Sequence, residues 1–142
     1  MGPLFVQIIT PERVVSELTA DMVVIPSKDG EMGILPGHAP VLSELIPGAV
    51  RIRQESNVEF FAVSGGFVQV DKSKVIILAE TAEMAQEIDE ERARQSAERA
   101  RAQLNQPVDA ATLAAAEASL KRALVRLQLS QVVRKNDRVR VR

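Results

Sequence analysis

The feature that most constrains this chain is a change of sequence pattern close to Met84. Before it, short apolar and β-branched runs alternate with turn residues, and this part of the chain has 6 basic and 11 acidic side chains. After it, the chain is rich in Ala, Arg and Glu, with 12 basic and 8 acidic side chains. Alanine occurs 6 times in the first part and 12 times in the shorter second part. The two patterns favour different secondary structure and predict two domains, residues 1–84 and 85–142.

The first domain has the pattern of β-structure, because turn residues interrupt the apolar runs at short intervals. Asp29-Gly30 fits a tight reversal that needs a positive φ, and Ser64-Gly65-Gly66 is expected to reverse the chain again. No helical pattern intervenes, which favours a flattened barrel or sandwich over a βαβ fold. The expected strands span residues 4–9, 14–18, 22–25, 33–35, 41–45, 50–54, 58–63, 67–70 and 75–78.

The second domain has the pattern of two helices with a break at Pro107, and Asp89 and Asp109 are the expected N-caps. The short connection predicts an antiparallel hairpin. Its apolar seam is small, so the hairpin should be only marginally stable alone. The second helix is expected to run to about Val132, with residues 134–142 as a frayed tail. The expected seam positions are Ala93, Ala97, Ala100 and Leu104 on the first helix, and Leu113, Ala116, Leu120, Leu124 and Leu127 on the second.

Composition excludes several classes of protein. The chain has no Cys, which excludes a disulfide scaffold, a thiolate zinc site and a cysteine nucleophile. Aromatic residues make up 3% of the chain and all are Phe, which leaves almost no stacking platform for nucleic acid or sugar. No apolar run is long enough to span a bilayer, and the first residues lack the basic start of a signal peptide. We therefore expect a cytosolic chain.

The residues offer little for catalysis. His38 is the only imidazole, with Glu31 and Glu44 as its nearest carboxylates in sequence, and neither a triad nor a metal site follows from that set. A histidine that holds its loop by hydrogen bonds, or contacts a partner protein, is the simpler interpretation. Ser64-Gly65-Gly66 lacks the Lys of a phosphate loop and precedes a strand, so it is interpreted as a turn. We expect the chain not to be an enzyme.

The arginines of the hairpin are a candidate anion site. If the helices reverse near Pro107, Arg92 lies level with Arg122, and Asp89 lies level with Arg126. Guanidinium groups gathered beside a positive helix N-terminus repel one another unless an anion neutralises them. Phosphate suits this role because its oxygens match the guanidinium fork. The pattern therefore permits a phosphate site. Arg99 lies seven residues after Arg92 on the same side of the helix and could extend that site.

The acidic residues near these arginines leave two interpretations open. Glu83 and Asp89 could hold the polar edge of a base or a ribose. Alternatively, the arginines form a solvated face with ion pairs between Glu90 and Arg94 and between Arg94 and Glu98. Each such pair stabilises a helix by roughly 0.2–0.5 kcal/mol. Spacing alone does not separate these alternatives.

Three segments carry a resemblance to a known family. Residues 29–40 read DGEMGILPGHAP, residues 64–70 read SGGFVQV and residues 77–83 read ILAETAE, and an Ala/Arg-rich helical hairpin follows them. Together they closely resemble the epsilon subunits of bacterial F-type ATP synthases. The resemblance covers about residues 4–133, and the basic segment beyond lies outside the pattern.

This resemblance implies a flattened ten-stranded β-sandwich followed by an antiparallel two-helix hairpin. It implies a non-catalytic rotor subunit of the central stalk, which couples the catalytic head to the c-ring and binds the gamma subunit. Glu31 and His38 fall in the segment that faces the ring and gamma in this family. The implied location is the cytoplasmic face of the bacterial cell membrane, with attachment only through the complex.

The resemblance also implies a regulatory role for ATP. Residues 88–93 read IDEERA and match the ATP-binding motif of bacillus-like members, whose hairpin either folds down or extends into the alpha/beta catalytic hexamer and opposes hydrolysis. ATP is the implied ligand, with Mg as an optional companion. The implied ATP-binding residues are Glu83, Ile88, Asp89, Arg92, Ala93, Arg99, Arg122 and Arg126.

Other functions remain as alternatives. The same rotor subunit could carry a constitutive or purely structural hairpin, in which ATP binding has no regulatory role. A nucleic-acid binder is disfavoured because acidic residues are interleaved with the basic ones and aromatic residues are scarce. An exposed apolar patch could also let the isolated chain form a homodimer.

Overall fold

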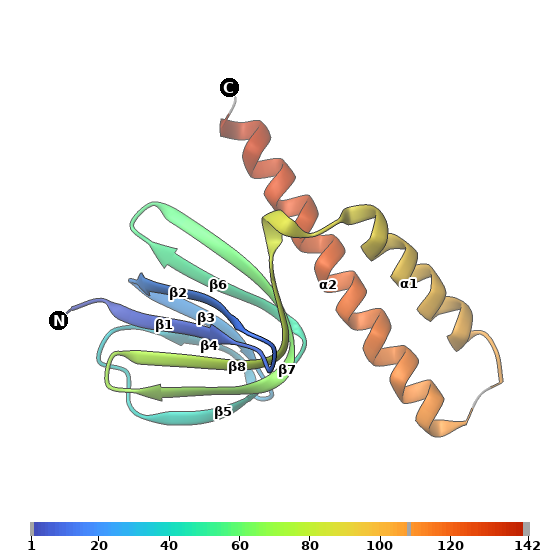
Figure 1. Cartoon of the computed structure of the whole chain (residues 1–142), viewed down its shortest axis with the longest axis horizontal. Coiled ribbons are helices and arrows are strands. Elements are labelled where there is room, and N and C mark those ends of the chain that lie inside the picture. Colours follow the sequence, from blue (N-terminus) through green and yellow to red (C-terminus); the bar gives the residue numbers. More distant parts are fainter. Residues whose placement is uncertain (1, 108, 141–142) are drawn as a thin grey trace. The chain divides into compact units, whose positions relative to one another are not determined.

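The computed structural model describes residues 2–107 and 109–140 of the chain. The chain divides into two compact units, Met1–Met84 and Ala85–Arg142. The first contains only strands and the second only helices (Figure 1). The expected fold class, a β-sandwich followed by two helices, is confirmed.

Eight strands build the first unit. Their hydrogen-bonded order is β2-β1-β8-β7-β5-β3-β4, and β6 pairs with both β3 and β7. The pair β1 and β8 is parallel, and the other pairs are antiparallel. The strands are β1 (Leu4–Ile9), β2 (Val14–Ala20), β3 (Met22–Ser27), β4 (Gly30–Ile34), β5 (Val41–Leu45), β6 (Gly48–Gln54), β7 (Asn57–Asp71) and β8 (Lys74–Met84).

Two long strands explain why eight strands are found where ten were expected. The first half of β7 pairs with β6, and the second half pairs with β5. Strand β8 pairs with β7 over most of its length and with β1 at its start. Each long strand therefore contributes to both layers of the sandwich, where the ten-strand expectation divides it in two.

The prediction that Ser64-Gly65-Gly66 reverses the chain is wrong, because these residues lie inside β7. Gly65 and Gly66 have φ values of 31° and 126° and give the strand a local change of direction without a turn. A Cβ at Gly66 would meet the backbone oxygen of Leu78 on β8. The glycine is therefore needed for the close approach of two strands.

The core of the first unit consists of side chains that alternate along the strands and point between the layers. Ser64 is the buried polar exception on β7, and its hydroxyl bonds to the Thr81 hydroxyl at 2.5 Å and accepts the Thr81 backbone N–H at 3.1 Å. The burial of Ser64 is thus compensated by hydrogen bonds. Fully buried members of the core include Leu4, Val6, Ile8, Val23, Ile25, Ile34, Val50, Phe61, Val68, Val75 and Ile77.

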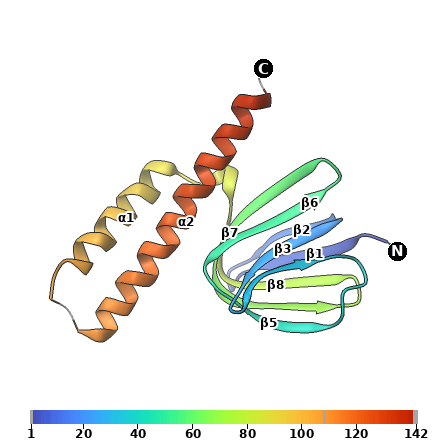
Figure 2. The same ribbon diagram turned by 180° about the vertical axis from the view of Figure 1, so that it is seen from behind.

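The second unit begins with a 3-10 turn, η1 (Ala85–Glu87), followed by α1 (Glu90–Leu104) and α2 (Ala110–Arg140). The two α-helices pack side by side and antiparallel (Figures 1 and 2). Both predicted caps are confirmed: Asp89 accepts the Arg92 N–H at 3.2 Å, and Asp109 accepts the Thr112 N–H at 2.7 Å. The hydrogen bond from Thr112 lowers the pKa of the exposed Asp109 carboxyl.

Alanine dominates the seam of the hairpin. On α1 the buried residues are Ala93, Ala97 and Ala100, as expected. On α2, Ala116 and Ala123 are buried, whereas Leu113 and Leu124 are exposed, which corrects part of the predicted leucine stripe. Small side chains on both helices permit a closer backbone approach than leucines would allow, so the alanine positions of α2 take the seam.

Helix α2 is twice as long as α1, with 31 residues against 15, and it runs beyond the start of α1 (Figure 1). The prediction that it ends near Val132 and is followed by a frayed tail is wrong for residues 134–140, which are helical. Extending an existing helix by another residue is far easier than nucleating a new one, so the basic segment continues it. Residues 141–142 lie outside the described part. None of the described helices is long and apolar enough to cross a membrane.

Candidate functional site

A polar flank of α1 carries two of the predicted arginines. Arg92, Ser96, Arg99 and Gln103 recur at spacings of four, three and four and therefore share one side of the helix, beside the alanine seam. Arg92 and Arg99 are exposed, and Ser96 is half-buried. The Arg99 Nη2 atom donates a hydrogen bond to the Ser96 Oγ atom at 3.2 Å.

The matching flank of α2 carries Ser119, Arg122 and Arg126, again at spacings of three and four. An open hollow of about 470 Å³ connects the two flanks. Ser119 lines it from α2, while Ser96, Arg99 and Gln103 line it from α1. The two polar flanks therefore lie on the same side of the hairpin, which we name the arginine face: Arg92, Ser96, Arg99, Gln103, Ser119, Arg122 and Arg126.

The antiparallel register places the arginines along this face. Ser96 and Ser119 line the same hollow. A register that sets these two residues level would set Arg122 level with the residue after Arg92 and Arg126 level with Asp89, close to the positive end of the α1 dipole. Arg99 lies about 10 Å further along α1, at 1.5 Å per residue.

The remaining predicted ATP-binding residues have structural roles or lie elsewhere. Asp89 caps α1, and the Ile88 N–H donates to the Ala85 carbonyl at 3.3 Å in the turn before the helix. Ala93 is fully buried in the seam. Glu83 lies near the end of β8, in the other unit. The arginines and Asp89 thus belong to the helical unit, and Glu83 belongs to the unit of strands.

The solvated-face alternative is confirmed in part at Arg94, the arginine that it named. Arg94, on another side of α1, pairs with Glu90 at 3.3 Å and with Glu91 at 3.1 Å. Its expected pairing with Glu98 does not occur among the ion pairs of the described residues. The Glu90 to Arg94 pairing is confirmed, but it does not neutralise the arginine face.

The predicted interface residues Glu31 and His38 lie in different local environments. Glu31 belongs to β4, and its carboxylate lies 3.4 Å from the Arg51 guanidinium of β6. His38 lies between β4 and β5, where its Nδ1 atom is 2.7 Å from the Ala39 carbonyl and its backbone N–H donates to the Leu35 carbonyl. His38 therefore holds its own loop by hydrogen bonds. Within the described ranges, no three His, Cys, Asp or Glu side chains are grouped to hold a metal.

One outer face of the sandwich carries several exposed apolar side chains among polar ones. Phe67 on β7 pairs with Leu78 on β8, and Leu78 pairs with Ile9 on β1. Phe67 and Leu78 are 53% and 45% exposed, although large apolar side chains usually lie inside. By strand alternation and register, Phe5 and Leu42 point to the same side. We name this set the apolar sheet face: Phe5, Ile9, Leu42, Phe67 and Leu78.

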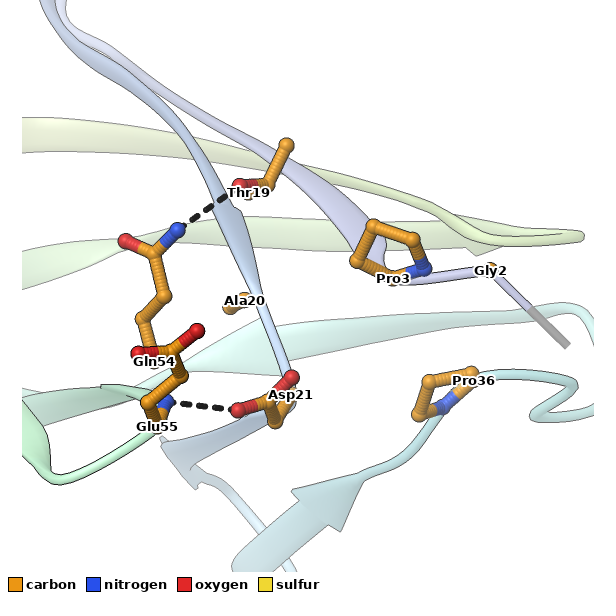
Figure 3. Close-up of a pocket in the computed structure, with 8 residues that line it drawn as sticks. All are labelled: Gly2, Pro3, Thr19, Ala20, Asp21, Pro36, Gln54 and Glu55. Carbon is orange, nitrogen blue, oxygen red and sulfur yellow. Dashed lines mark hydrogen bonds between the residues drawn. The ribbon is translucent and has the colours of Figure 1, made fainter.

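A second hollow, of about 400 Å³, lies in the sandwich where the chain start meets three connections between strands (Figure 3). The Glu55 N–H donates to the Asp21 carboxylate at 2.6 Å, and the Gln54 amide donates to the Thr19 hydroxyl at 3.0 Å. These bonds tie the β6–β7 turn to the end of β2. No His, Lys or Arg is among the residues that line this hollow, so the hollow does not suit a phosphate.

Sequence reasoning missed Ser96, Gln103 and Ser119. The signal was present, because each lies three, four or seven residues from a predicted arginine and so shares its helical face. Only the packing of α1 on α2, however, shows that the two flanks meet around one hollow.

Comparisons with known proteins agree across both units. Residues 3–85 match the beta-sandwich domain of the ATP synthase delta/epsilon chain, and residues 86–131 match the long alpha-helix domain of the same chain.

Individual relatives give the same result. An ATP synthase epsilon chain from Moorella thermoacetica is 44% identical over 134 residues, covering 94% of this chain and 100% of the relative. One from Halalkalibacterium halodurans is 45% identical over 131 residues, with coverage of 92% and 98%. Among solved structures, a chain of the Euglena gracilis mitochondrial ATP synthase (OSCP/F1/c-ring) superposes with a TM-score of 0.79 at 25% identity, covering 94% of this chain and 82% of that chain.

Proposed function

Because the chain belongs to the ATP synthase delta/epsilon family, as an epsilon-type, non-catalytic subunit of the central stalk, we propose that its helical hairpin binds ATP and thereby regulates ATP hydrolysis by the complex. The observation that carries this proposal is the arginine face. Arg99 lines the hollow between the two helices, and helical spacing assigns Arg92 to the flank of Arg99 and Arg122 and Arg126 to the flank of Ser119.

Electrostatics give the face its preference for a polyphosphate. Guanidinium groups bind phosphate oxygens in bidentate fashion, and a helix N-terminus favours negative charge, so a phosphate chain suits a face that carries several arginines near the start of α1. Asp89 lies at the same end, and its carboxylate is oriented by the helix cap. We infer that Asp89 and Ile88 lie near the base or ribose, while the arginines hold the phosphates. We further propose that Glu83 contacts the bound nucleotide and that Mg accompanies the phosphates.

The switch follows from the pairing of the helices. The arginines share one face only while α1 and α2 are packed, so ATP binds the paired hairpin more tightly than separated helices. A ligand shifts such an equilibrium by its differential affinity for the two forms. The alanine seam buries little area and opposes separation weakly. High ATP therefore favours the paired hairpin, and low ATP releases helices that can extend toward the alpha/beta hexamer.

The apolar sheet face is the basis for proposing the remaining binding partners. Exposed apolar side chains that adjoin one another across strands mark a protein-binding surface. We propose that this face binds the gamma subunit, and that the segment with Glu31 and His38 contacts the c-ring, so that the membrane is reached only through the complex. In the isolated chain the same face could pair with a second copy, which analytical ultracentrifugation over a range of concentrations would detect.

Calorimetric titration of the full chain tests ATP binding. The parent chain should bind ATP at one site, and the Arg92→Ala/Arg126→Ala variant should bind it at least tenfold more weakly. Arg94→Ala is the matched control, because Arg94 lies on another side of α1 and should leave the affinity unchanged. Absence of heat with the parent chain would remove the sensor and leave the stalk subunit.

Hydrolysis by the reconstituted complex tests regulation. Deleting residues 88–142 should raise hydrolysis most at low ATP, where the parent hairpin is released. A rise of equal size at all ATP concentrations would indicate a constitutive brake, and no change would indicate a purely structural hairpin. Either of these two results would contradict the regulatory part of the proposal.

A further inference from the structure

A row of polar side chains crosses the apolar sheet face. Gln69 lies two residues after Phe67 on β7, so both side chains point to the same side of the sheet. The residues that pair with Gln69 across the neighbouring strands point to that side as well. We name the set the polar row; from β2 to β5 it consists of Glu17, Gln7, Ile76, Gln69 and Leu42.

Glu17 and Gln7 are joined within this row. The Gln7 Nε2 atom donates a hydrogen bond to the Glu17 Oε1 atom at 2.8 Å, from one strand to the next. Among the described residues, the second carboxylate oxygen of Glu17 has no hydrogen bond or ion pair. That oxygen can only accept, so a protein that covers this point must supply a donor.

The cost of covering a carboxylate indicates which donor fits. Glu17 is exposed, so water reaches its carboxylate in the chain alone. A partner that replaced this water with apolar atoms would leave the carboxylate without hydrogen bonds, which is unfavourable. A positively charged donor makes the strongest bond to it. The first unit has 6 basic and 11 acidic side chains, so long-range attraction also favours a basic partner.

The polar row is unfavourable for a second copy of this chain. In the order β2-β1-β8-β7-β5, β8 is the middle strand, and Ile76 is the middle residue of the row. Two such faces can pack about a two-fold axis through Ile76. An axis along β8 places Glu17 opposite Leu42 of the other copy, and an axis along the row places it opposite the other Glu17. Leucine offers no donor and like charges repel, so neither arrangement satisfies the carboxylate.

We propose that Glu17 selects the partner of the apolar sheet face: it binds a lysine or arginine of the gamma subunit and opposes self-association of the chain. This inference rests on the proposed binding of gamma to this face. The apolar side chains provide contact area for either partner, whereas the carboxylate discriminates between the two. Val14 on β2 pairs with Ile9 and is 50% exposed, so apolar area lies beside Glu17 on the same strand.

The test measures gamma binding by the full chain in a pull-down titration and its self-association by sedimentation equilibrium. Glu17→Gln should weaken gamma binding about tenfold, because a bond between charged groups is lost, and should strengthen self-association at least about fivefold. Added salt should weaken gamma binding by the parent more than by this variant. Glu55→Gln makes the same change of charge in the exposed β6–β7 turn, and this matched control should alter neither property.

The results separate this inference from the proposed function. Absence of gamma binding by the parent chain, or gamma binding that Phe67→Glu leaves unchanged, removes the proposed role of the face and this inference with it. Gamma binding that Phe67→Glu weakens but Glu17→Gln does not overturns only the role of Glu17. Equal salt dependence of parent and Glu17→Gln, or self-association no stronger in the variant, also overturns it. Weaker gamma binding, a smaller salt effect and stronger self-association in Glu17→Gln together support it.

Discussion

Replacing Gly66 with alanine should destabilise the sandwich more than the same change at Gly30 or Gly33. Gly66 has a φ of 126°, which side chains rarely adopt, and an added Cβ would meet the Leu78 backbone oxygen. Backbone strain of this kind costs about 1–3 kcal/mol. Forcing two paired strands apart adds about 1–3 kcal/mol, as overpacking does in a core. Together the two contributions give an expected loss of about 2–6 kcal/mol, a large share of a typical domain stability.

Two other glycines separate the two contributions. Gly30 has a φ of 116° but no heavy atom within 4 Å of an added Cβ, so Gly30→Ala should cost only the strain, about 1–3 kcal/mol. At Gly33 an added Cβ would lie 3.2 Å from the flexible end of Met22, without positive φ, and the change should cost less than about 1 kcal/mol. The expected order of destabilisation is Gly66, then Gly30, then Gly33.

Urea unfolding at equilibrium measures this order. The chain has no Trp or Tyr, so methyl NMR signals of the fully buried Ile8, Ile25 and Ile77 should report the sandwich independently of the helices. A Gly66→Ala variant that unfolds at the same urea concentration as Gly30→Ala would refute the argument, because the contact with Leu78 would then have no cost beyond backbone strain.

Three further changes test other parts of the structure. Ala97→Leu adds volume to the closely packed seam and should lower the stability of the hairpin by about 1–3 kcal/mol, measured by hydrogen exchange of α1 amides. Because the pKa of Asp109 is lowered in the folded state, its ionised cap should stabilise α2 above about pH 4, and this stabilisation should be lost as the pH falls further. Far-UV circular dichroism of the parent chain should show this loss of helix at low pH, and Asp109→Asn should flatten that part of the profile. Phe67→Glu should weaken gamma binding at least tenfold in a pull-down titration while leaving the urea midpoint within experimental error, since Phe67 is 53% exposed.

Local sequence patterns predicted most of the fold, because they act within a few residues. Asp89 and Asp109 were identified as caps from residue type and position, and both accept the expected N–H. Gly30 supplies the expected positive φ at the end of a tight turn. The Ala93, Ala97 and Ala100 seam followed from helical spacing, and all three residues are buried.

The incorrect predictions concern features that are determined by contacts between distant parts of the chain. Ser64-Gly65-Gly66 has the composition of a turn, but pairing of β7 with β8 on both sides of the glycines keeps the strand continuous. Leu113 and Leu124 were expected in the seam of α2 but are exposed, whereas Ala123, which was not expected there, is buried like the expected Ala116. Helix α2 also continues through the alternating basic segment, where local pattern indicated its end.

The candidate site was predicted in part. Spacing placed Arg92 with Arg99 and Arg122 with Arg126, and the structure shows that both flanks face the same way. Ser96 was missed although its spacing from Arg92 and Arg99 places it on their side of the helix, because spacing does not show which neighbour a small polar side chain bonds. Its hydrogen bond to Arg99 identifies it.

The most direct test of the account is a structure of this chain determined with ATP present. The account predicts phosphate oxygens within hydrogen-bond distance, about 2.7–3.2 Å, of guanidinium groups from both α1 and α2, Arg92 and Arg122 among them. Arginine side chains directed into solvent, with the nucleotide absent or bound elsewhere on the chain, would contradict it.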